Sequence, residues 1–227
     1  MKFISICSGI EAASVAFGPL GWTAIAFSEI EPFPSAVLAH HYPTVPNMGD
    51  MSKFAEWPEQ LFIDADAIVG GPPCQAFSVA GNRAGLDDAR GNLTLTYSAL
   101  INHADDIRLR HGRPPAVCLY ENVPGLLSDK TGAFGCLLGS LSGEECELVP
   151  PGKRWTDSGA VLGPQRAVAW RTLDAQWFGL AQRRRRVFVV ASARDGFDPS
   201  KVLFEFDGVR RDTAPSREAG KAAPTIP

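Results

Sequence analysis

The stretch AIVGGPPCQAFS, residues 67–78, joins a short apolar run to a loop with two glycines and two prolines. Proline fixes φ and removes a backbone donor, whereas glycine permits tight turning, so the pattern predicts a strand that ends at a stiff loop. Cys74 would then sit on a rigid support, where a helix start or a basic side chain could stabilise its thiolate. This setting favours a nucleophile over a structural cysteine.

Short apolar runs alternate with helical patterns along most of the chain. The runs predict strands at residues 3–7, 23–28, 67–69, 116–120, 167–173 and 187–191. The helical patterns cover residues 12–17, 34–41, 93–109 and 131–141. Strands that alternate with helices imply crossover connections, so we expect an α/β fold with a mostly parallel sheet and helices on both faces.

The pattern weakens near residue 195. We expect one further short strand at residues 202–206, followed by a polar tail rich in Pro, Ala, Arg and Gly. The interpretation is therefore one domain at residues 1–193 and a linker or disordered tail at residues 194–227.

Length and composition fit one globular α/β domain. The 227 residues are 45% hydrophobic and 21% charged, with a net charge of −3. This charge does not indicate a nucleic-acid-binding protein, although a local basic patch needs no overall excess. Glu11 interrupts the apolar N-terminal stretch, and no run reaches the roughly 18 apolar residues of a membrane span, so we expect a cytoplasmic protein with no membrane partner.

The cysteines indicate neither a disulfide framework nor a metal site. They lie at positions 7, 74, 118, 136 and 146, and they form no Cys-x-x-Cys pair and no Cys/His cluster. We therefore expect no metal. The odd number and the apolar surroundings of Cys7 and Cys118 fit a reducing compartment.

Polar residues follow the expected strands at the edge where parallel sheets bind ligands. Ser8-Gly9-Ile10-Glu11 follows the first strand, where glycine allows a ligand to approach closely, but an ordinary turn explains it equally well. Glu29 and Glu31 follow the second strand and suit ribose hydroxyls or solvent. Asp50 suits a ligand or a helix cap. The dinucleotide fingerprint Gly-x-Gly-x-x-Gly is absent.

Two further segments carry candidate chemistry. Glu121 ends an apolar strand, where burial would raise the pKa of its carboxyl and suit it to donate a proton; alternatively, Asn122 caps a helix and the glutamate is incidental. Four arginines precede the last strand in QRRRRVFVV, residues 182–190. Alternation puts Arg184 and Arg186 on one face, where guanidinium groups suit phosphates or bases, the alternative being a solvated charge run.

In this order, the segments resemble the C5-cytosine-specific DNA methyltransferases. The resemblance covers roughly residues 3–192 and rests above all on Pro-Cys-Gln at 73–75, Glu-Asn-Val at 121–123 and Gln-x-Arg-x-Arg at 182–186. It implies a Rossmann-like fold that binds S-adenosylmethionine. It also implies methyl transfer to C5 of a cytosine that is flipped out of double-stranded DNA.

The resemblance implies a role for each matched residue. Cys74 would attack C6 of cytosine, and Glu121 would contact N3 and supply a proton. Arg184 and Arg186 would hold the base and the Cys74 loop. The supporting residues would be Gln75, Asn122, Val123 and Gln182. The cofactor contacts would be Ser8, Gly9, Ile10, Glu11, Glu29, Ile30, Asp50, Met51, Pro73 and Leu93.

The chain departs from the family pattern in two places. Its first loop is poorer in glycine, and no recognition region, Arg-rich helix or closing segment follows Ala193. We therefore expect a truncated, weakly active protein, or one completed by a separate recognition polypeptide. A monomer in a bacterial or phage-infected cytoplasm is the accompanying expectation.

Three alternatives stay open. A branch of the same family modifies RNA, so an RNA cytosine-5 methyltransferase is one. A non-catalytic nucleic-acid-binding or cofactor-binding relic is another. A nicotinamide-dependent oxidoreductase would leave the Cys74 loop and the arginine run unexplained.

Overall fold

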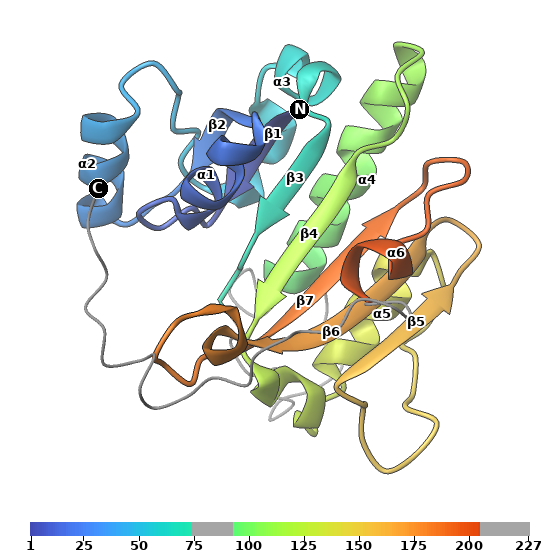
Figure 1. Ribbon diagram of the computed structural model, residues 1–227. Helices are drawn as coiled ribbons and strands as arrows, with labels where there is room; N and C mark the ends of the chain where they lie inside the picture. Colours follow the sequence, from blue (N-terminus) through green and yellow to red (C-terminus); the bar gives the residue numbers. More distant parts are fainter. Residues whose placement is uncertain (74–92, 205–227) are drawn as a thin grey trace.

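The computed structural model describes residues 1–73 and 93–204 (Figure 1). Within them, a seven-stranded sheet has the order β2-β1-β3-β4-β7-β6-β5. The strands are β1 Lys2–Ile6, β2 Thr23–Ser28, β3 Ala67–Gly70, β4 Val117–Asn122, β5 Ser158–Leu162, β6 Ala167–Asp174 and β7 Arg185–Ser192. The helices are α1 Ala12–Phe17, α2 Pro32–His41, α3 Glu59–Asp64, α4 Leu93–Arg110, α5 Ala133–Ser142 and α6 Ser200–Leu203. The 3-10 turns are η1 Gly18–Leu20, η2 Met51–Glu56, η3 Pro124–Ser128 and η4 Ala175–Phe178.

The sheet is mixed. Strands β2, β1, β3 and β4 pair in parallel, as the alternation of elements predicts. Strand β7 pairs antiparallel with β4, and β6 and β5 continue antiparallel to their neighbours. The connections β5–β6 and β6–β7 contain no long crossover helix, and such connections join antiparallel strands.

Helices cover both faces of the sheet, as expected. The larger core lies between the sheet and α3, α4 and α5 and includes Ile4, Ile68 and Tyr120. Phe3 points to the opposite face, because successive strand residues alternate, and packs in a second cluster with Phe27 and Leu38. Figure 1 shows α6 in front of the sheet and α4 behind it.

Two buried arginines join α4 to the rest of the molecule. The Nη2 atom of Arg166 lies 2.7 Å from Oδ2 of Asp105, and both side chains are almost fully buried. The other oxygen of Asp105 accepts a hydrogen bond from the backbone N–H of Ala116 at 2.7 Å. Arg108 donates to the backbone carbonyls of Phe62, Ile63, Ala65 and Pro114.

The strand expected at residues 202–206 is wrong where the structure describes it, because α6 covers Ser200–Leu203. Asp198 Oδ1 accepts a hydrogen bond from the N–H of Ser200 at 2.9 Å, which favours a helical turn. Leu203 then packs against Ala169 and Val190 on the sheet. Residues 205 and 206 lie outside the described residues.

Further elements that the sequence did not predict include α3 and the edge strand β5. Residues after 193 also contact the body of the fold, since Nη2 of Arg194 donates to the carbonyl of Asp66 at 2.9 Å. Within the described part of the chain, no helix has the length and apolar character that crossing a membrane requires.

Candidate active site

The C-terminal ends of β1, β3 and β4 open into a cavity of about 640 Å³. One part of its lining is apolar and includes Phe17 on α1, Leu119 on β4 and Phe188 on β7. The charged part includes Glu121, Arg184 and Arg186. The cavity therefore brings the Glu-Asn-Val segment and the arginine run to the loop that follows β1.

Glu121 and Arg186 form an ion pair at this cavity. Oε1 of Glu121 lies 2.8 Å from Nε of Arg186, and the side chains are 35% and 23% exposed. The Glu121 carboxyl is thus about a third exposed and paired with a cation, and it is not buried as the sequence suggested. A Cβ atom at Gly71 would lie 2.9 Å from Oε2 of Glu121, so a side chain here would displace the Glu121 carboxyl.

Asn122 links β4 to the stem of the Cys74 loop. Its Nδ2 donates to the carbonyl of Pro72 at 3.1 Å and to the hydroxyl of Tyr120 at 2.7 Å. Its Oδ1 accepts from the N–H of Val123 at 2.8 Å. Pro72 precedes Cys74 by two residues, so the end of β4 anchors the chain just before the candidate nucleophile. Cys74 and Gln75 themselves lie outside the described residues.

Sequence reasoning overlooked Tyr120. Strand alternation was the available signal, because residues 120 and 122 of a strand share one face. Phe17 and Phe178, which line the cavity from α1 and η4, were also overlooked. Their contribution depends on packing between elements that are distant in sequence.

The arginine run divides between two cavities. Arg184 and Arg186 line the cavity of Glu121, whereas Arg183 and Arg185 line a second one, as strand alternation predicts. The backbone N–H of Arg184 donates to Oδ1 of Asp174 at 3.0 Å. Gln182 is exposed and is absent from the lining that the described residues provide, so the structure does not bring its side chain to the two arginines.

The loop after β1 has an unusual backbone. Cys7, Gly9 and Glu11 have φ values of 51°, 55° and 71°. Positive φ is uncommon for residues with a Cβ atom, and such strain concentrates at functional sites. Oε2 of Glu29 accepts a hydrogen bond from the N–H of Gly9 at 2.8 Å, so the ends of β1 and β2 are joined.

Glu11 is buried at the start of α1. Its Oε1 accepts from the N–H of Ser14 at 2.9 Å and caps the helix. Its Oε2 is buried and has no hydrogen-bond partner among the described residues. Burial raises the pKa of this carboxyl above its usual range.

Asp50 and Met51 flank the same loop. Oδ1 of Asp50 accepts from the N–H of Ser52 at 2.8 Å, which is the helix-cap arrangement that the sequence left open. Met51 accepts a hydrogen bond from Sγ of Cys7 at 3.6 Å. Burial, followed by the charges of Glu29 and Asp50, raises the pKa of Cys7 to about 11. The loop therefore lies in a negative electrostatic environment.

The other expected cofactor contacts are less enclosed. Ser8 lines the cavity, whereas Ile10 and Ile30 are 63% and 67% exposed. Pro73 is exposed, and Leu93 is partly buried at the first position of α4. In the described part of the chain, the following residues do not line the cavity: Gly9, Ile10, Glu11, Glu29, Ile30, Asp50, Met51, Pro73 and Leu93.

Cys7, Cys118 and Cys136 are poor candidates for catalysis. Burial raises the pKa of Cys118 to about 12 and that of Cys136 to about 11. Together with Cys7, these thiols stay protonated near neutral pH, whereas a nucleophile needs the thiolate. Among residues 1–73 and 93–204, no group of three or more His, Cys, Asp or Glu side chains could hold a metal ion.

The family model of the C-5 cytosine-specific DNA methylases matches residues 1–144. The chain belongs to this family. It is 52% identical over 98% of its length to the DNA N-6-adenine-methyltransferase of Escherichia phage P1. It is 32% identical over 91% of its length to the type II methyltransferase M2.BsuMI of Bacillus subtilis.

The chain spans 32% of the phage P1 protein and 45% of the Bacillus one, so it corresponds to a third to a half of these relatives. Two solved structures have the same fold. The Dnmt2 methyltransferase of S. pombe has a TM-score of 0.62 at 16% identity, over 96% of this chain and 57% of that one. DNMT2 of Spodoptera frugiperda has a TM-score of 0.60 at 20% identity, over 87% of this chain and 51% of that one. The expected Rossmann-like methyltransferase fold is confirmed.

Proposed function

We propose that this protein transfers a methyl group from S-adenosylmethionine to C5 of cytosine in double-stranded DNA. The observation that carries the proposal is the Glu121–Arg186 ion pair, 2.8 Å long, in a cavity that extends to the loop after β1. Asn122 supports it, because it donates a hydrogen bond to the carbonyl of Pro72, two residues before Cys74. The family match supports the reaction class.

The residues around the loop after β1 fit S-adenosylmethionine, which the family and the fold imply. Oε2 of Glu11 is a buried oxygen that lacks a partner among the described residues. The Glu29 and Asp50 carboxylates provide negative charge, and S-adenosylmethionine carries a positive sulfonium and an ammonium. The apolar side of the cavity at Phe17 and Leu119 suits an adenine ring. When bound, the cofactor supplies an electrophilic methyl group.

In the proposed reaction, Sγ of Cys74 forms a bond to C6 of the cytosine while Glu121 donates a proton to N3. Addition to C6 makes C5 electron-rich, so C5 would take the methyl group as its bond to the sulfonium sulfur breaks and S-adenosylhomocysteine leaves. Loss of the C5 proton to a base, cleavage of the Sγ–C6 bond and return of the N3 proton to Glu121 release 5-methylcytosine. Both enzyme groups are regenerated, and the base must leave the duplex to reach them.

The chain's own residues supply positioning. The ion pair with Arg186 fixes the orientation of the Glu121 carboxyl toward the cavity. Asn122 holds the stem of the loop, and the prolines of residues 72–73 limit its freedom, so that Sγ stays near its target. We propose that the catalytic domain comprises residues 1–204 and not 1–193, because Arg194 and Leu203 pack against the sheet.

Methylation of adenine N6 is a second candidate, because the phage P1 relative is named for it. The adenine amino group is itself the nucleophile in that reaction, so a thiol that adds to the ring is not needed. This chain corresponds to 32% of that protein, whose remaining length leaves room for the named activity elsewhere. We therefore favour cytosine C5.

A duplex that carries 5-fluorocytosine tests the proposal. Fluorine cannot leave C5 as a proton does, so a competent enzyme remains covalently attached when S-adenosylmethionine is present. We expect an adduct by intact mass, its loss in Cys74→Ser, and a rate lower by about 100-fold or more in Glu121→Gln. Cys136→Ser is the matched control and keeps the adduct.

Nucleoside analysis separates the competing functions. Digestion of methylated plasmid DNA should give 5-methylcytosine and no N6-methyladenine. Methylation of adenine would overturn the proposal, and so would an adduct that persists in Cys74→Ser. A parallel reaction with transfer RNA tests the RNA alternative, which predicts more 5-methylcytosine in RNA than in DNA.

A further inference from the structure

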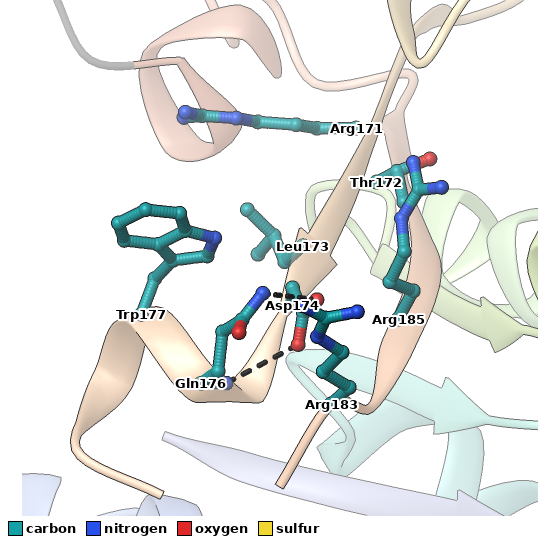
Figure 2. A pocket seen from close by; sticks show the side chains of 8 residues that line it. All are labelled: Arg171, Thr172, Leu173, Asp174, Gln176, Trp177, Arg183 and Arg185. Carbon is teal, nitrogen blue, oxygen red and sulfur yellow. Dashed lines mark hydrogen bonds between the residues drawn. The ribbon is translucent and has the colours of Figure 1, made fainter. Parts of the chain in front are cut away.

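A second cavity, of about 570 Å³, lies on the other side of the arginine run (Figure 2). It is lined by Arg171, Thr172, Leu173, Asp174, Gln176, Trp177, Arg183 and Arg185. Strand β5 stops pairing at Arg171, whereas β6 continues to Asp174, so the cavity lies at the part of β6 that β5 leaves uncovered. The proposed methyl transfer uses none of these side chains.

A third cavity, of about 520 Å³, shares Arg185 with the second. Its lining includes Pro124 and Gly125, which directly follow the Glu-Asn-Val segment, as well as Arg154. The surface that joins the two cavities therefore runs from the catalytic segment to the outer arginines. We call Arg154, Arg171, Trp177, Arg183 and Arg185 the outer arginine face.

Three arginines of this face, Arg154, Arg183 and Arg185, are exposed to solvent, where an anionic partner can reach them. Arg185 pairs with Asp157 at 2.9 Å, but the side chains are 52% and 66% exposed, and exposed pairs are weak and exchangeable. The Asp174 carboxylate already accepts hydrogen bonds from Gln176 and from the N–H of Arg184. Arg171 donates to the backbone carbonyl of Leu203 at 2.7 Å, so the charges assigned to a partner are those of Arg154, Arg183 and Arg185.

Trp177 adds an aromatic surface to the basic one. Its side chain is 47% exposed, and Figure 2 shows its indole on the same side of the cavity as the Arg171 side chain. Exposed tryptophan beside arginine is the combination that binds nucleic-acid strands, because guanidinium groups contact phosphates and aromatic rings stack on bases.

We propose that the outer arginine face binds the DNA backbone next to the target cytosine, an inference that rests on the proposed function. Contacts to phosphates position the duplex without reading its sequence. An enzyme that flips a base out of the duplex needs contacts of this kind, because the flanking nucleotides must stay in place while the target base leaves the base stack. Arg184 and Arg186 then act on the base, and Arg183 and Arg185 act on the phosphates.

Binding measured over a series of salt concentrations tests this division. The full chain is titrated against two fluorescent duplexes of unrelated sequence, as wild type and as Arg183→Gln/Arg185→Gln. The slope of log K against log salt is negative, and each lost phosphate contact reduces its magnitude by about 0.9, so we expect that magnitude to fall by about 2. Affinity should fall by the same factor for both duplexes.

Arg110→Gln is the matched control. Arg110 forms an exposed ion pair of 2.8 Å with Glu59 at the end of α4, so its loss removes one surface guanidinium and one pair away from the face. This variant should keep the wild-type slope. An unchanged slope in Arg183→Gln/Arg185→Gln, or an equal fall in Arg110→Gln, overturns the proposal.

A second readout separates this proposal from the proposed function. The wild-type chain is incubated with the 5-fluorocytosine duplex, and the adduct reports methyl transfer independently of the salt slope. If the wild-type chain forms the adduct and the salt slope of Arg183→Gln/Arg185→Gln equals that of wild type, DNA binding by the outer arginine face is refuted and the proposed methyl transfer is not. If the salt slope of the double variant is smaller in magnitude but the wild-type chain forms no adduct, DNA binding by the outer arginine face is supported and the proposed methyl transfer is refuted.

Discussion

Arginine serves opposite purposes in two regions of this molecule. Arg108 and Arg166 lie at 0% side-chain exposure on the α4 side, where backbone carbonyls and the Asp105 carboxylate accept their hydrogen bonds. Arg183 and Arg185 lie exposed at the start of β7 and face two open cavities. The residue type alone does not tell these roles apart; the acceptors do.

The difference shows how an arginine can be assigned either to stabilising the fold or to binding a ligand. A buried guanidinium needs acceptors or a countercharge within the protein, because an unpaired buried charge is strongly destabilising. Nη2 of Arg108 makes no hydrogen bond to the described residues but lies 3.7 Å from the Asp66 carboxylate. An exposed guanidinium loses little without a partner, so it can bind a ligand. Arg186 lies between these cases, since it is 23% exposed and paired with the catalytic candidate Glu121.

The largest expected effect is that of Arg166→Met. The substitution leaves Asp105 buried without its countercharge, so we expect the free energy of unfolding to fall by about 3–5 kcal/mol. Urea denaturation followed by circular dichroism measures it. A decrease in the free energy of unfolding below about 1 kcal/mol, which is typical of an exposed ion pair, would mean that the buried arginines stabilise the fold no more than the exposed ones.

Arg186→Met should have the converse effect. It removes the partner that orients Glu121, so we expect adduct formation with 5-fluorocytosine to slow by about 100-fold or more. The urea midpoint should stay near the wild-type value, because the pair is partly exposed. If Arg186→Met lowers both the urea midpoint and the rate of adduct formation, Arg186 stabilises the fold as Arg108 and Arg166 do, and the prediction is wrong.

Arg108→Lys tests the requirement for several donors. Lysine is a compact point charge and cannot reach the four carbonyls that Arg108 contacts, so we expect a loss of about 1–3 kcal/mol. Arg185→Lys, the matched exposed substitution, should change the free energy of unfolding by less than about 0.5 kcal/mol. Equal losses by urea denaturation would contradict the comparison.

Tyr120→Phe should have a smaller effect. It removes one of the two acceptors of Asn122 Nδ2, whose other acceptor is the carbonyl of Pro72. We expect a loss of about 1 kcal/mol in unfolding free energy and slower adduct formation at saturating duplex. Tyr42→Phe is the control, and an equal slowing there would exclude a positioning role for Tyr120.

The smallest effect concerns pH. Burial raises the pKa of Asp105, despite the opposing effect of Arg166. A carboxyl whose folded pKa exceeds its unfolded value stabilises the fold at low pH and loses that contribution as pH rises through the folded pKa. Wild type should therefore gain stability relative to Asp105→Asn as the solution is acidified. A gap in urea midpoint that is independent of pH would refute this.

Much of the fold was predictable from local pattern. The expected strands at residues 3–7 and 67–69 correspond to β1 and β3, because short, mostly apolar runs are typical of the buried strands of a parallel sheet. The strand β5, SGAVL, was missed because it is short and partly exposed at the sheet edge. The run VLF at residues 202–204 suggested a strand, whereas Asp198 and Pro199 favoured the start of a helix.

The candidate site was predictable only in part. The Glu-Asn-Val and Gln-x-Arg-x-Arg segments were identified from the chain, and alternation separated Arg184 and Arg186 from their neighbours. The sequence did not predict which residues these side chains contact. The ion pair of Glu121 with Arg186 joins two strands that lie more than sixty residues apart in the chain. The hydrogen bond from Asn122 to Pro72 likewise depends on the pairing of β3 with β4.

The chain's residue pattern was sufficient for the alternation of strands and helices, the strand-end position of the candidate groups and the family. These features depend on local conformational preference and on residue types at fixed spacing. The mixed sheet, the acceptors of each arginine and the exposure of Glu121 required the folded molecule. Burial and charge pairing arise when distant segments meet, and no local pattern contains that information.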